Sequence, residues 1–516
     1  MNMRIDSRTF WLAIAALVGF SGVAAANNIY VGQSETGLAN GQDCSNTKSV
    51  AYFNNNAYWV NSNPVGLQIG PGTTVHLCQT ISTEMTVHGS GSNGSPITIL
   101  FEAGAKLSLP YCSNRDVNGC INLSNAGYII LDGGTNGVIE NTANGSALGN
   151  QKDSVGILAN GTHDSEIRNL AISNLYVHSS STDEPDLSRS AAIYMVAINN
   201  LAIHNNTIHD CYWCLNYQFE SSSTGVTIYS NEIYNVEHGI AFGGYGGGTV
   251  SASSIYRNYI HDYANWDVAT GDFHHDGIHF YTNAGAVING ADIYNNTFGG
   301  DPGNYLTSHV YIEHDGSDVN NVHVYNNVVL APPSTRSMNF GMMAFGPNTG
   351  TLVYNNTIQC GTQAAGYGVI LEAGNTIFEN NIVTGCWAAV AFYFQSPNVV
   401  VNYNTYANNN YVGYFLYNGT NLTMLTDWQT ATAGQDANSL AVADAGVNAA
   451  NGTLTGTSAA IRTGINLYSL GIARLNLDKA DNARPQSGAW DEGAYQFSSS
   501  TPGPPSPPSG LTVSVN

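Results

Sequence analysis

The chain has 516 residues and a formal net charge of −22 at pH 7, with 14 Lys and Arg against 36 Asp and Glu. Such an acidic chain repels nucleic acid and anionic membranes at long range, so we expect no nucleic-acid partner. Only 10% of its residues are charged, yet it holds 30 Tyr, 16 Phe and 7 Trp. Disordered chains combine high charge with few aromatic residues, so the composition predicts a folded protein.

The N-terminus has the pattern of a secretory signal peptide. Arg4 and Arg8 precede an apolar stretch at residues 10–23, and three alanines (24–26) offer a cleavage site before Asn27. We therefore predict residues 1–26 as a signal peptide and a secreted protein, with the periplasm and the cell surface as alternative locations. The stretch is short for a membrane span, and no later segment resembles one. A retained N-terminal anchor is the alternative.

Eight cysteines in an exported chain favour disulfides over metal sites. Closeness in the sequence predicts the pairs Cys112–Cys120 and Cys211–Cys214. Cys360 and Cys386 follow equivalent Asn positions of the repeat and should pair on neighbouring coils, which leaves Cys44 to pair with Cys78. The segment 211–214 also has the spacing of a redox CxxC motif, but it lacks the βαβ setting that such chemistry uses.

A hexapeptide of the form Ile-x-x-Asn-x-Ile recurs along the middle of the chain. Its copies are IHNNTI (203–208), IYSNEI (228–233), IYRNYI (255–260), IYNNTF (293–298), VYNNVV (324–329), VYNNTI (353–358), FENNIV (378–383) and VNYNTY (401–406). The fourth position is always Asn, and IRNLAI (167–172) is a variant copy with Asn at the third position. The spacing between the conserved Asn positions varies from 23 to 38 residues, so a basic unit of 23 to 25 residues carries insertions.

Each copy predicts two short strands joined by a bend, with alternate apolar side chains pointing inward. One coil of this length cannot bury its own apolar face, so the coils must stack and extend parallel sheets. Asn suits the bend because it tolerates left-handed geometry and its amide can bond the neighbouring coil. We therefore predict an all-β, single-stranded right-handed parallel β-helix with an Asn ladder that is structural.

The alternatives fit the pattern less well. A β-sandwich would place strands every 8 to 12 residues with frequent hairpin turns, and a leucine-rich solenoid would need a leucine consensus. Segments 73–82, 97–109 and 128–141 are also typical of coils. We place the β-helix at residues 27–425, a C-terminal closing segment at 426–497 and a Pro/Ser-rich disordered tail at 498–516.

The sequence resembles the secreted bacterial β-helix proteins of the pectate-lyase-like superfamily. SAAIRTGINL (458–467) and RPQSGAWDEGAYQF (484–497) resemble the closing motifs common in that group, although Glu492 stands where Ile is usual. The resemblance covers nearly the whole mature chain and implies the fold. It does not imply one activity, because this fold hosts lyases, hydrolases, epimerases and adhesins.

The longest spacings in the repeat, 38 and 31 residues, coincide with a concentration of ionisable side chains. Half of the fourteen histidines lie there, namely His261, His274, His275, His279, His309, His314 and His323. Two segments, DFHHDGIHFYT (272–282) and HVYIEHD (309–315), focus the cluster. If Ile278 and Val310 point into the core, adjacent coils place His279 beside Tyr311 on the outer face. A shift of one residue would bury Tyr311 instead.

Carboxylates, imidazoles and aromatic rings together are typical of a carbohydrate site. The predicted catalytic residues are Asp272, Asp276, His279 and Glu313. The predicted substrate-binding residues are His274, His275, Tyr281, Tyr311, His314 and Trp266. We expect the segment with Asp272, His274, His275 and Asp276 to be a long loop before an exposed patch.

Two routes of glycan cleavage are open. Hydrolysis needs a pair of carboxyls, whereas elimination from a uronate needs a base and a group, such as a calcium ion, that neutralises the uronate. Basic residues are scarce in these coils, with Arg257 and then Arg336, and the polygalacturonase motifs are absent, so hydrolysis is favoured. His274-His275-x3-His279 lacks the helical setting of a zincin, so we predict no metal site, and calcium enters only with elimination.

A second patch of polar and aromatic residues lies one to two coils earlier. It comprises Tyr212, Trp213, Tyr217 and Glu220 and extends toward Glu237 and His238, and packing is its favoured interpretation. We expect a monomer that acts on an extracellular polysaccharide. The rival hypothesis is a non-catalytic adhesin or structural surface protein whose face binds glycan.

Overall fold

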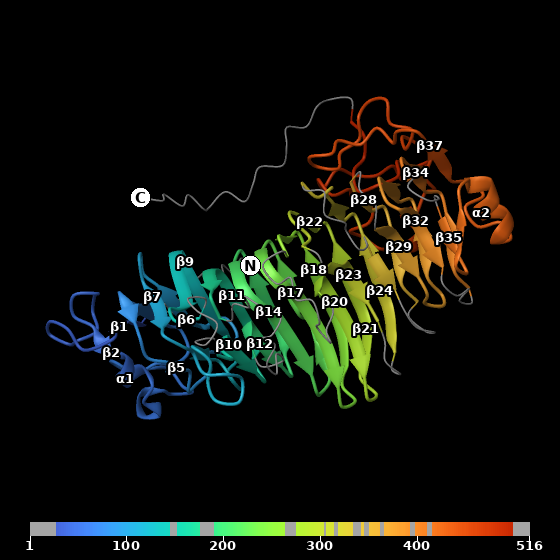
Figure 1. The fold of residues 1–516 in the computed structure, drawn as a ribbon. Coiled ribbons are helices and arrows are strands. Elements are labelled where there is room, and N and C mark those ends of the chain that lie inside the picture. The colour runs from blue at the N-terminus through green and yellow to red at the C-terminus, as the bar shows by residue number, and fades with distance from the viewer. Residues whose placement is uncertain are drawn as a thin grey trace, which may run out of the picture.

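The structure, a computed structural model, describes residues 27–144, 152–175, 190–263, 275–303, 306–313, 318–333, 342–344, 350–361, 366–392, 398–409 and 415–498. Each coil of the chain contributes up to three short strands, which pair in parallel with the corresponding strands of the next coil. The coils stack in chain order from the blue end to the orange end of Figure 1. The prediction of a right-handed parallel β-helix is confirmed.

Three columns of stacked strands form the three faces of the β-helix. The first face contains β1 (Asn27–Gly32), β3 (Thr73–Leu77), β6 (Ile97–Phe101), β9 (Ile129–Asn141), β11 (His163–Ser173), β13 (Asn199–His204), β16 (Thr227–Tyr229), β18 (Thr249–Tyr256), β21 (Val287–Tyr294), β24 (Val319–Tyr325), β27 (Leu352–Tyr354), β30 (Ile377–Glu379) and β33 (Val400–Asn402). The ends of β9 and β11 bend onto the second face.

The second face continues each coil after the bend. It contains β4 (Thr80–Ile81), β7 (Lys106–Leu109), β14 (Thr207–Phe219), β17 (Glu232–Tyr245), β19 (Tyr259–His261), β22 (Thr297–Gly299), β25 (Val328–Val329), β28 (Thr357–Gln359), β31 (Ile382–Thr384), β34 (Thr405–Ala407) and β37 (Leu440–Val442). The long strands β14 and β17 run on into the third face.

The third face completes the coil and carries the candidate site. Its further strands are β5 (Met85–Thr86), β8 (Ile121–Asn122), β10 (Val155–Asn160), β12 (Ala191–Val196), β20 (His275–Asn283), β23 (Leu306–Ile312), β26 (Met342–Ala344), β29 (Tyr367–Leu371), β32 (Ala388–Phe392) and β35 (Phe415–Tyr417). Two short strands add to the first face, where β15 (Ser223–Thr224) pairs with β13 and β18, and β2 (Lys48–Ser49) pairs with β1. Outside the columns lie β36 (Thr420–Leu422), α1 (Val50–Phe53), α2 (Leu425–Ala431) and the 3-10 turns η1 (Asn56–Tyr58) and η5 (Tyr468–Leu470).

The interior is filled by columns of identical or similar apolar side chains. Ile203, Ile228, Ile255 and Ile293 occupy the same register position on successive first-face strands, and all four are fully buried. Because every coil presents the same inward positions, burial of one apolar side chain is completed by the coil above and the coil below. The core is therefore continuous along the stack.

The Asn ladder runs along the bend between the first and second faces. Its members are Asn206, Asn231, Asn258, Asn296, Asn327, Asn356, Asn381 and Asn404, all buried. The Oδ1 of Asn258 accepts hydrogen bonds from the backbone N–H of Asn231 (3.1 Å) and from its Nδ2 (3.0 Å), while the Nδ2 of Asn258 donates to the carbonyl of Ile228 (3.0 Å). Nδ2 of Asn258 also donates to Oδ1 of Asn296 on the following coil (3.0 Å), so the ladder joins three coils at each step.

The left-handed backbone of the bend is adopted one residue earlier than the ladder position. Asn205, Asn295 and Asn326 have φ near +55°, and Ser230 and Arg257 do as well. The sequence suggests that a single Asn both turns the chain and bonds the neighbouring coils. The structure divides these roles, because the ladder Asn needs its side chain pointing inward, where it can bond adjacent coils, while its predecessor turns the chain.

The C-terminal segment runs back over the later coils beside the ladder bend, where Figure 1 shows it in red. The partly buried Lys479 donates to the carbonyl of Asn296 (2.8 Å), and the buried Arg484 donates to Oδ1 of Asn326 (2.9 Å). The fully buried Trp490 packs in a cluster with tyrosines of the first-face strands. These contacts cover one side of the stack with residues far along the chain.

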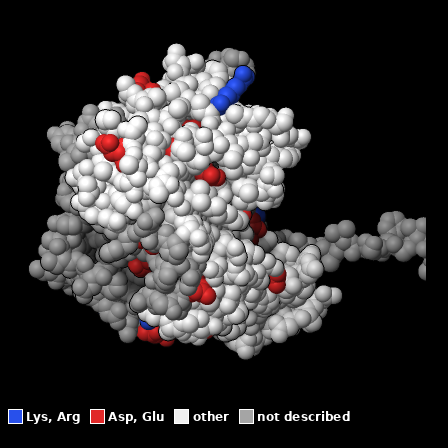
Figure 2. Space-filling view, turned by 90° about the vertical axis from the view of Figure 1, so that its right-hand side faces the viewer, with Lys and Arg blue, Asp and Glu red and all other residues white. Residues whose placement is uncertain are grey.

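All four predicted disulfides are present, and they use all eight cysteines. Within the described residues, no helix is long and apolar enough to cross a membrane. Figure 2 looks at the stack from the side of its last coils, where described acidic side chains are scattered singly among uncharged ones.

Replacing Asn327 with Ala should destabilise the stack by about 3 kcal/mol, since each buried polar group left without a partner costs roughly 1–3 kcal/mol. The variant removes Oδ1 of Asn327, which accepts the Asn296 N–H (2.9 Å), and Nδ2 of Asn327, which donates to the carbonyl of Ile293 (2.9 Å). Urea unfolding followed by circular dichroism measures the change. Asn421→Ala, at an exposed position of β36, is the control, and equal shifts in both variants would contradict a stabilising ladder.

Candidate active site

The candidate site lies on the outer side of the third face, across β14, β17, β20 and β23. Strand register places His238 opposite Asp276, and His279 opposite Tyr311. Ile278 lies between Asp276 and His279 on β20 and is fully buried in the core, as is Val310 on β23. The predicted alternation and register are therefore confirmed, and they bring together side chains that are far apart in the sequence.

The structure places six of the ten predicted site residues on this face. They are His275, Asp276, His279, Tyr281, Tyr311 and Glu313. The other four, Asp272, His274, His314 and Trp266, lie outside the described residues. Their roles stay predictions.

Two expectations about this region are wrong. His275 and Asp276 belong to β20 and not to a preceding loop, because His275 pairs with Leu306 and Asp276 with Ser308 in the parallel pairing of β20 with β23. The patch is also not exposed, since Asp276 is 0% and His279 5% exposed. Rings on neighbouring coils stack and shield one another, with 4.9 Å between the centroids of His279 and Tyr311.

A chain of close polar contacts runs along the stack, from one coil to the next, starting from Tyr212. Its hydroxyl donates to Oε1 of Glu237 (2.8 Å), and Oε2 of Glu237 lies 2.6 Å from Nδ1 of His238. The opposite nitrogen of His238, Nε2, lies 3.1 Å from Nδ1 of His279. The two patches that the sequence analysis kept separate are therefore one continuous cluster.

The chain of contacts ends at Glu313. Nε2 of His279 lies 3.0 Å from Oε1 of Glu313, and the hydroxyl of Tyr311 donates to Oε2 of the same carboxyl (2.8 Å). The side chain of Glu313 is 27% exposed, whereas those of Glu237 and His238 are 1% exposed. Glu313 is thus the acidic member of the cluster that reaches solvent.

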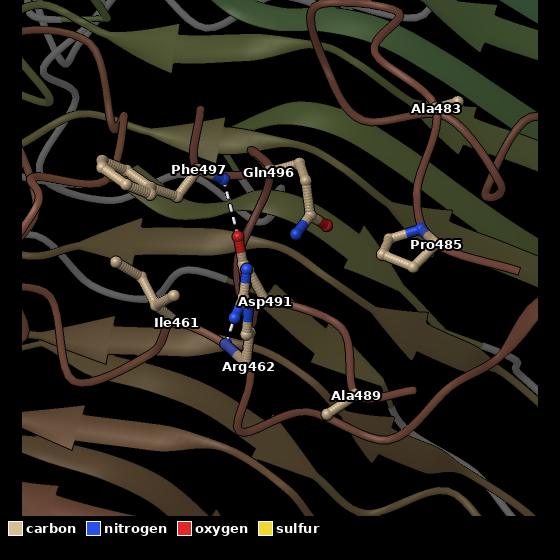
Figure 3. Close-up of a pocket in the computed structure, with 8 residues that line it drawn as sticks. All are labelled: Ile461, Arg462, Ala483, Pro485, Ala489, Asp491, Gln496 and Phe497. Carbon is tan, nitrogen blue, oxygen red and sulfur yellow. Dashed lines mark hydrogen bonds between the residues drawn. The ribbon is translucent and has the colours of Figure 1, made fainter. Parts of the chain in front are cut away.

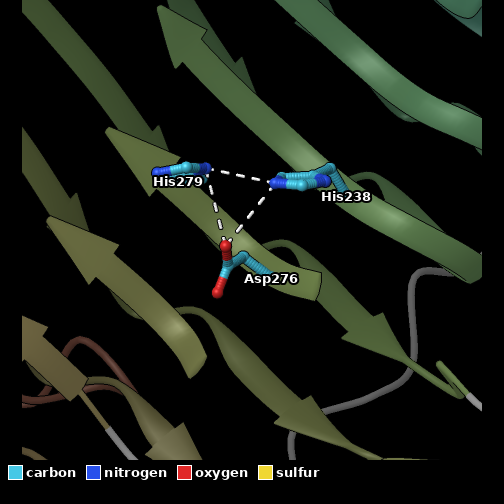
Figure 4. A group of neighbouring side chains, drawn as sticks. All are labelled: His238, Asp276 and His279. Atoms are coloured by element: carbon cyan, nitrogen blue, oxygen red, sulfur yellow. Dashed lines mark hydrogen bonds and ion pairs between the residues drawn. The ribbon is translucent and has the colours of Figure 1, made fainter. Parts of the chain in front are cut away.

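Asp276 lies beside the two histidines, as Figure 4 shows. Its Oδ2 is 3.5 Å from Nε2 of His238 and 3.5 Å from Nδ1 of His279. This buried oxygen has no hydrogen-bond donor among the described residues. His238, Asp276 and His279 are the side chains here that could jointly hold a metal ion.

Burial shifts the ionisable groups of the cluster in opposite directions. It raises the pKa of Glu237 to about 8, and with the nearby Glu237 and Glu313 it raises the pKa of Asp276 well above its ordinary value. Burial lowers the pKa of His279 to about 4. Both effects favour neutral forms, because a desolvated charge is costly.

Aromatic rings form the far edge of the site. The side chain of Gln218 donates to the hydroxyl of Tyr281 (2.6 Å), whose ring packs edge-on to Trp213 with 6.2 Å between centroids. Tyr281 lies over Gly243 of the preceding coil, where an added Cβ would be 1.9 Å from the tyrosine ring. The glycine at 243 is therefore a sequence signal for this close approach.

Arg115 is a member of the same outer face that the sequence analysis missed. Its Nη1 donates to the hydroxyl of Tyr194 (2.7 Å), and Tyr194 on β12 belongs to the register row of Asn216 and, two coils further on, His279. Arg115 comes from an early loop with no repeat motif, so only the stacking of coils reveals where it lies.

Three other described histidines of the concentrated region lie away from the cluster. His309 and Tyr263 are core residues, with the Tyr263 hydroxyl 3.3 Å from Nδ1 of His309. His323 pairs with Asp292 on the first face (2.9 Å), and His261 lies on the second face. Arg257 is bonded to Asp481 of the C-terminal segment, away from the site.

A pocket in the C-terminal segment does not form a second candidate site. Figure 3 shows its lining, which includes Arg462, Asp491 and Phe497. The carboxylate of Asp491 accepts the backbone N–H of Arg462 (2.8 Å) and that of Phe497 (2.6 Å). Its acceptors are therefore used to hold the segment together.

No known protein-family model matches the sequence, and no curated protein is similar to it. Among solved structures, it is similar to a GH136 lacto-N-biosidase from Eubacterium ramulus, at 13% identity and a TM-score of 0.49 over 81% of this chain and 67% of that chain. Pectate lyase Pel9A gives 14% identity and a TM-score of 0.39 over 92% and 98%. The catalytic domain of a GH87 alpha-1,3-glucanase gives 14% and 0.34 over 73% and 68%. The residues of the site itself are therefore the basis for assigning an activity to this chain.

The buried His309 should make the fold sensitive to acid. Burial lowers its pKa to about 3 from 6.5. Below pH 6.5 the unfolded chain takes up a proton that the folded protein refuses, so the stability that this site contributes is lost as the pH falls toward 3. The loss is about 1.4 kcal/mol per pH unit in that window. Urea midpoints measured at several pH values test this.

The variant His309→Gln, which cannot titrate, should flatten that pH dependence. His323→Gln, at a partly exposed ion pair, should keep the wild-type dependence. A pH dependence unchanged by His309→Gln would show that other groups cause the loss of stability in acid.

Proposed function

We propose that this protein hydrolyses glycosidic bonds of an extracellular polysaccharide on the outer side of the third face. The observation that carries the proposal is the cluster of carboxyls and imidazoles on its central coils. In the register row of His238 and Asp276, the outward positions of the preceding coils are the apolar Val155 and Ala191, and after the site Ile370 and Ala391 are outward and apolar. Formation of the β-helix does not require carboxyls and imidazoles at the centre of the third face, so their presence there supports a function.

Glu313 is the residue that we assign to contact with the sugar. It is the partly exposed carboxyl at the end of the cluster, and His279 and Tyr311 fix both of its oxygens. A carboxyl held in this way suits general acid–base catalysis at a glycosidic oxygen or an attacking water. Asp276 is fully buried, so it acts as a positioning residue through His279, and Asp272 is the predicted second carboxyl.

The charge of the site favours a neutral glycan over a uronate. Elimination requires a base together with neutralisation of the uronate carboxylate. Glu313 would instead repel a uronate bound beside it, and Arg115 lies toward the far edge, bonded to Tyr194. Aromatic rings such as Tyr281 and Trp213 complement the C–H faces of neutral sugars.

Replacing Glu313 with Gln should lower glycan hydrolysis roughly 10²–10⁴-fold, since a positioned acid or base contributes about that much. The variant keeps the size and the acceptor oxygen of the side chain but removes its ability to exchange a proton. Release of reducing ends from a panel of neutral and uronic glycans measures activity, and ultraviolet absorbance of unsaturated ends identifies elimination.

Glu166→Gln is the matched control. The side chain of Glu166 is 25% exposed and lies 2.6 Å from Nε2 of His204, so it repeats the carboxyl–imidazole contact of Glu313 on the first face. Its activity should equal that of the wild type. If the wild type binds some glycans but cleaves none, the protein is a glycan-binding adhesin and the proposal fails. Unsaturated products would show that the reaction is elimination and not hydrolysis.

A further inference from the structure

We propose that His238, Asp276 and His279 bind a divalent transition-metal ion of the zinc class, with three protein ligands and at least one position left open. This inference goes beyond glycan cleavage and does not depend on it. A protein that binds the ion but cleaves no glycan would support the metal site and contradict the proposed hydrolysis.

The spacing of the three facing atoms fits such an ion. Nε2 of His238 and Nδ1 of His279 are 3.1 Å apart, and Oδ2 of Asp276 is 3.5 Å from each. A point equidistant from all three therefore lies about 2.0 Å from each atom in their plane, close to the usual 2.0–2.1 Å of zinc–nitrogen bonds. Neighbouring ligands of a tetrahedral zinc ion are about 3.3 Å apart at those bond lengths.

The outer nitrogens of both histidines are oriented as in metal sites. Nδ1 of His238 faces Oε2 of Glu237 at 2.6 Å, and Nε2 of His279 faces Oε1 of Glu313 at 3.0 Å. When these nitrogens donate to carboxylates, the inner nitrogens carry lone pairs that point at each other. Carboxylate–histidine–metal arrangements are built in this way, and they raise the basicity of the ligand.

Asp276 supplies the second, independent observation. It is fully buried and its Oδ2 points toward the two histidines without a hydrogen-bond donor among the described residues, while Ser308 fixes the other oxygen at 3.0 Å. A buried carboxylate oxygen without a donor is costly, and an ion bound between the three side chains would complete its coordination.

The ligand types distinguish the ion from calcium. Calcium takes six to eight oxygen ligands, whereas two imidazoles and one carboxylate suit zinc and its transition-metal neighbours. The run from His274 to His279 is not a zincin motif. The set in the structure instead takes one residue from β17 and two from β20, so no local motif contains it.

The test uses the full-length secreted protein, stripped with a chelator, incubated with ZnCl₂ and desalted. Elemental analysis should find one zinc per chain, and CaCl₂ at the same concentration should leave none. Asp276→Asn and His238→Ala should each weaken zinc binding at least roughly 100-fold, because each removes a direct ligand. Titration calorimetry measures the affinities.

His204→Ala is the matched control, because His204 is also a buried histidine that contacts a carboxyl, Glu166, at 2.6 Å. It should bind zinc as the wild type does. If a ligand variant does not fold, Co²⁺ added to the stripped wild type decides, since intense visible absorption bands report a four-coordinate nitrogen and oxygen site. Wild type without stoichiometric zinc, or ligand variants that bind as tightly as His204→Ala, would overturn the proposal.

Discussion

Parallel stacking of coils in exact register is the constraint on which the rest of this structure depends. A single coil leaves its apolar side chains and the N–H and C=O groups of its strands without partners, so each coil depends on the coils on either side of it. The Asn ladder fixes the register, because each ladder amide bonds the coil before it and the coil after it. A shift of one residue would break the ladder and turn every apolar column outward.

Register also creates the candidate site. Residues such as Glu237 and Glu313 are far apart in the sequence, yet two intervening histidines connect them because each coil continues the rows of the coil before. Strand spacing of about 4.8 Å brings ring beside ring, so stacked aromatic and imidazole groups exclude water from one another. The same spacing that builds the core therefore buries an ionisable cluster on the outer side.

Neighbours, and not residue type, decide what each histidine does. His204 holds a partly exposed carboxyl on the first face, while His309 lies in the core beside a tyrosine hydroxyl. His238 and His279 differ from both, because carboxyls occupy their outer nitrogens and a third carboxyl faces their inner nitrogens. Only this last arrangement combines proton exchange at a solvent edge with the geometry of a metal site.

The sequence by itself determined the fold, the ladder, the disulfides and the alternation on β20 and β23, because each of these follows from local periodicity or from spacing along the chain. It also located Asp276, His279 and Glu313 in one region. Only the tertiary structure decided that Glu237 and His238 belong to the same cluster and that Asp276 is buried. Those facts depend on which rows of neighbouring coils meet, and a periodic pattern does not specify contacts across coils whose lengths differ through insertions.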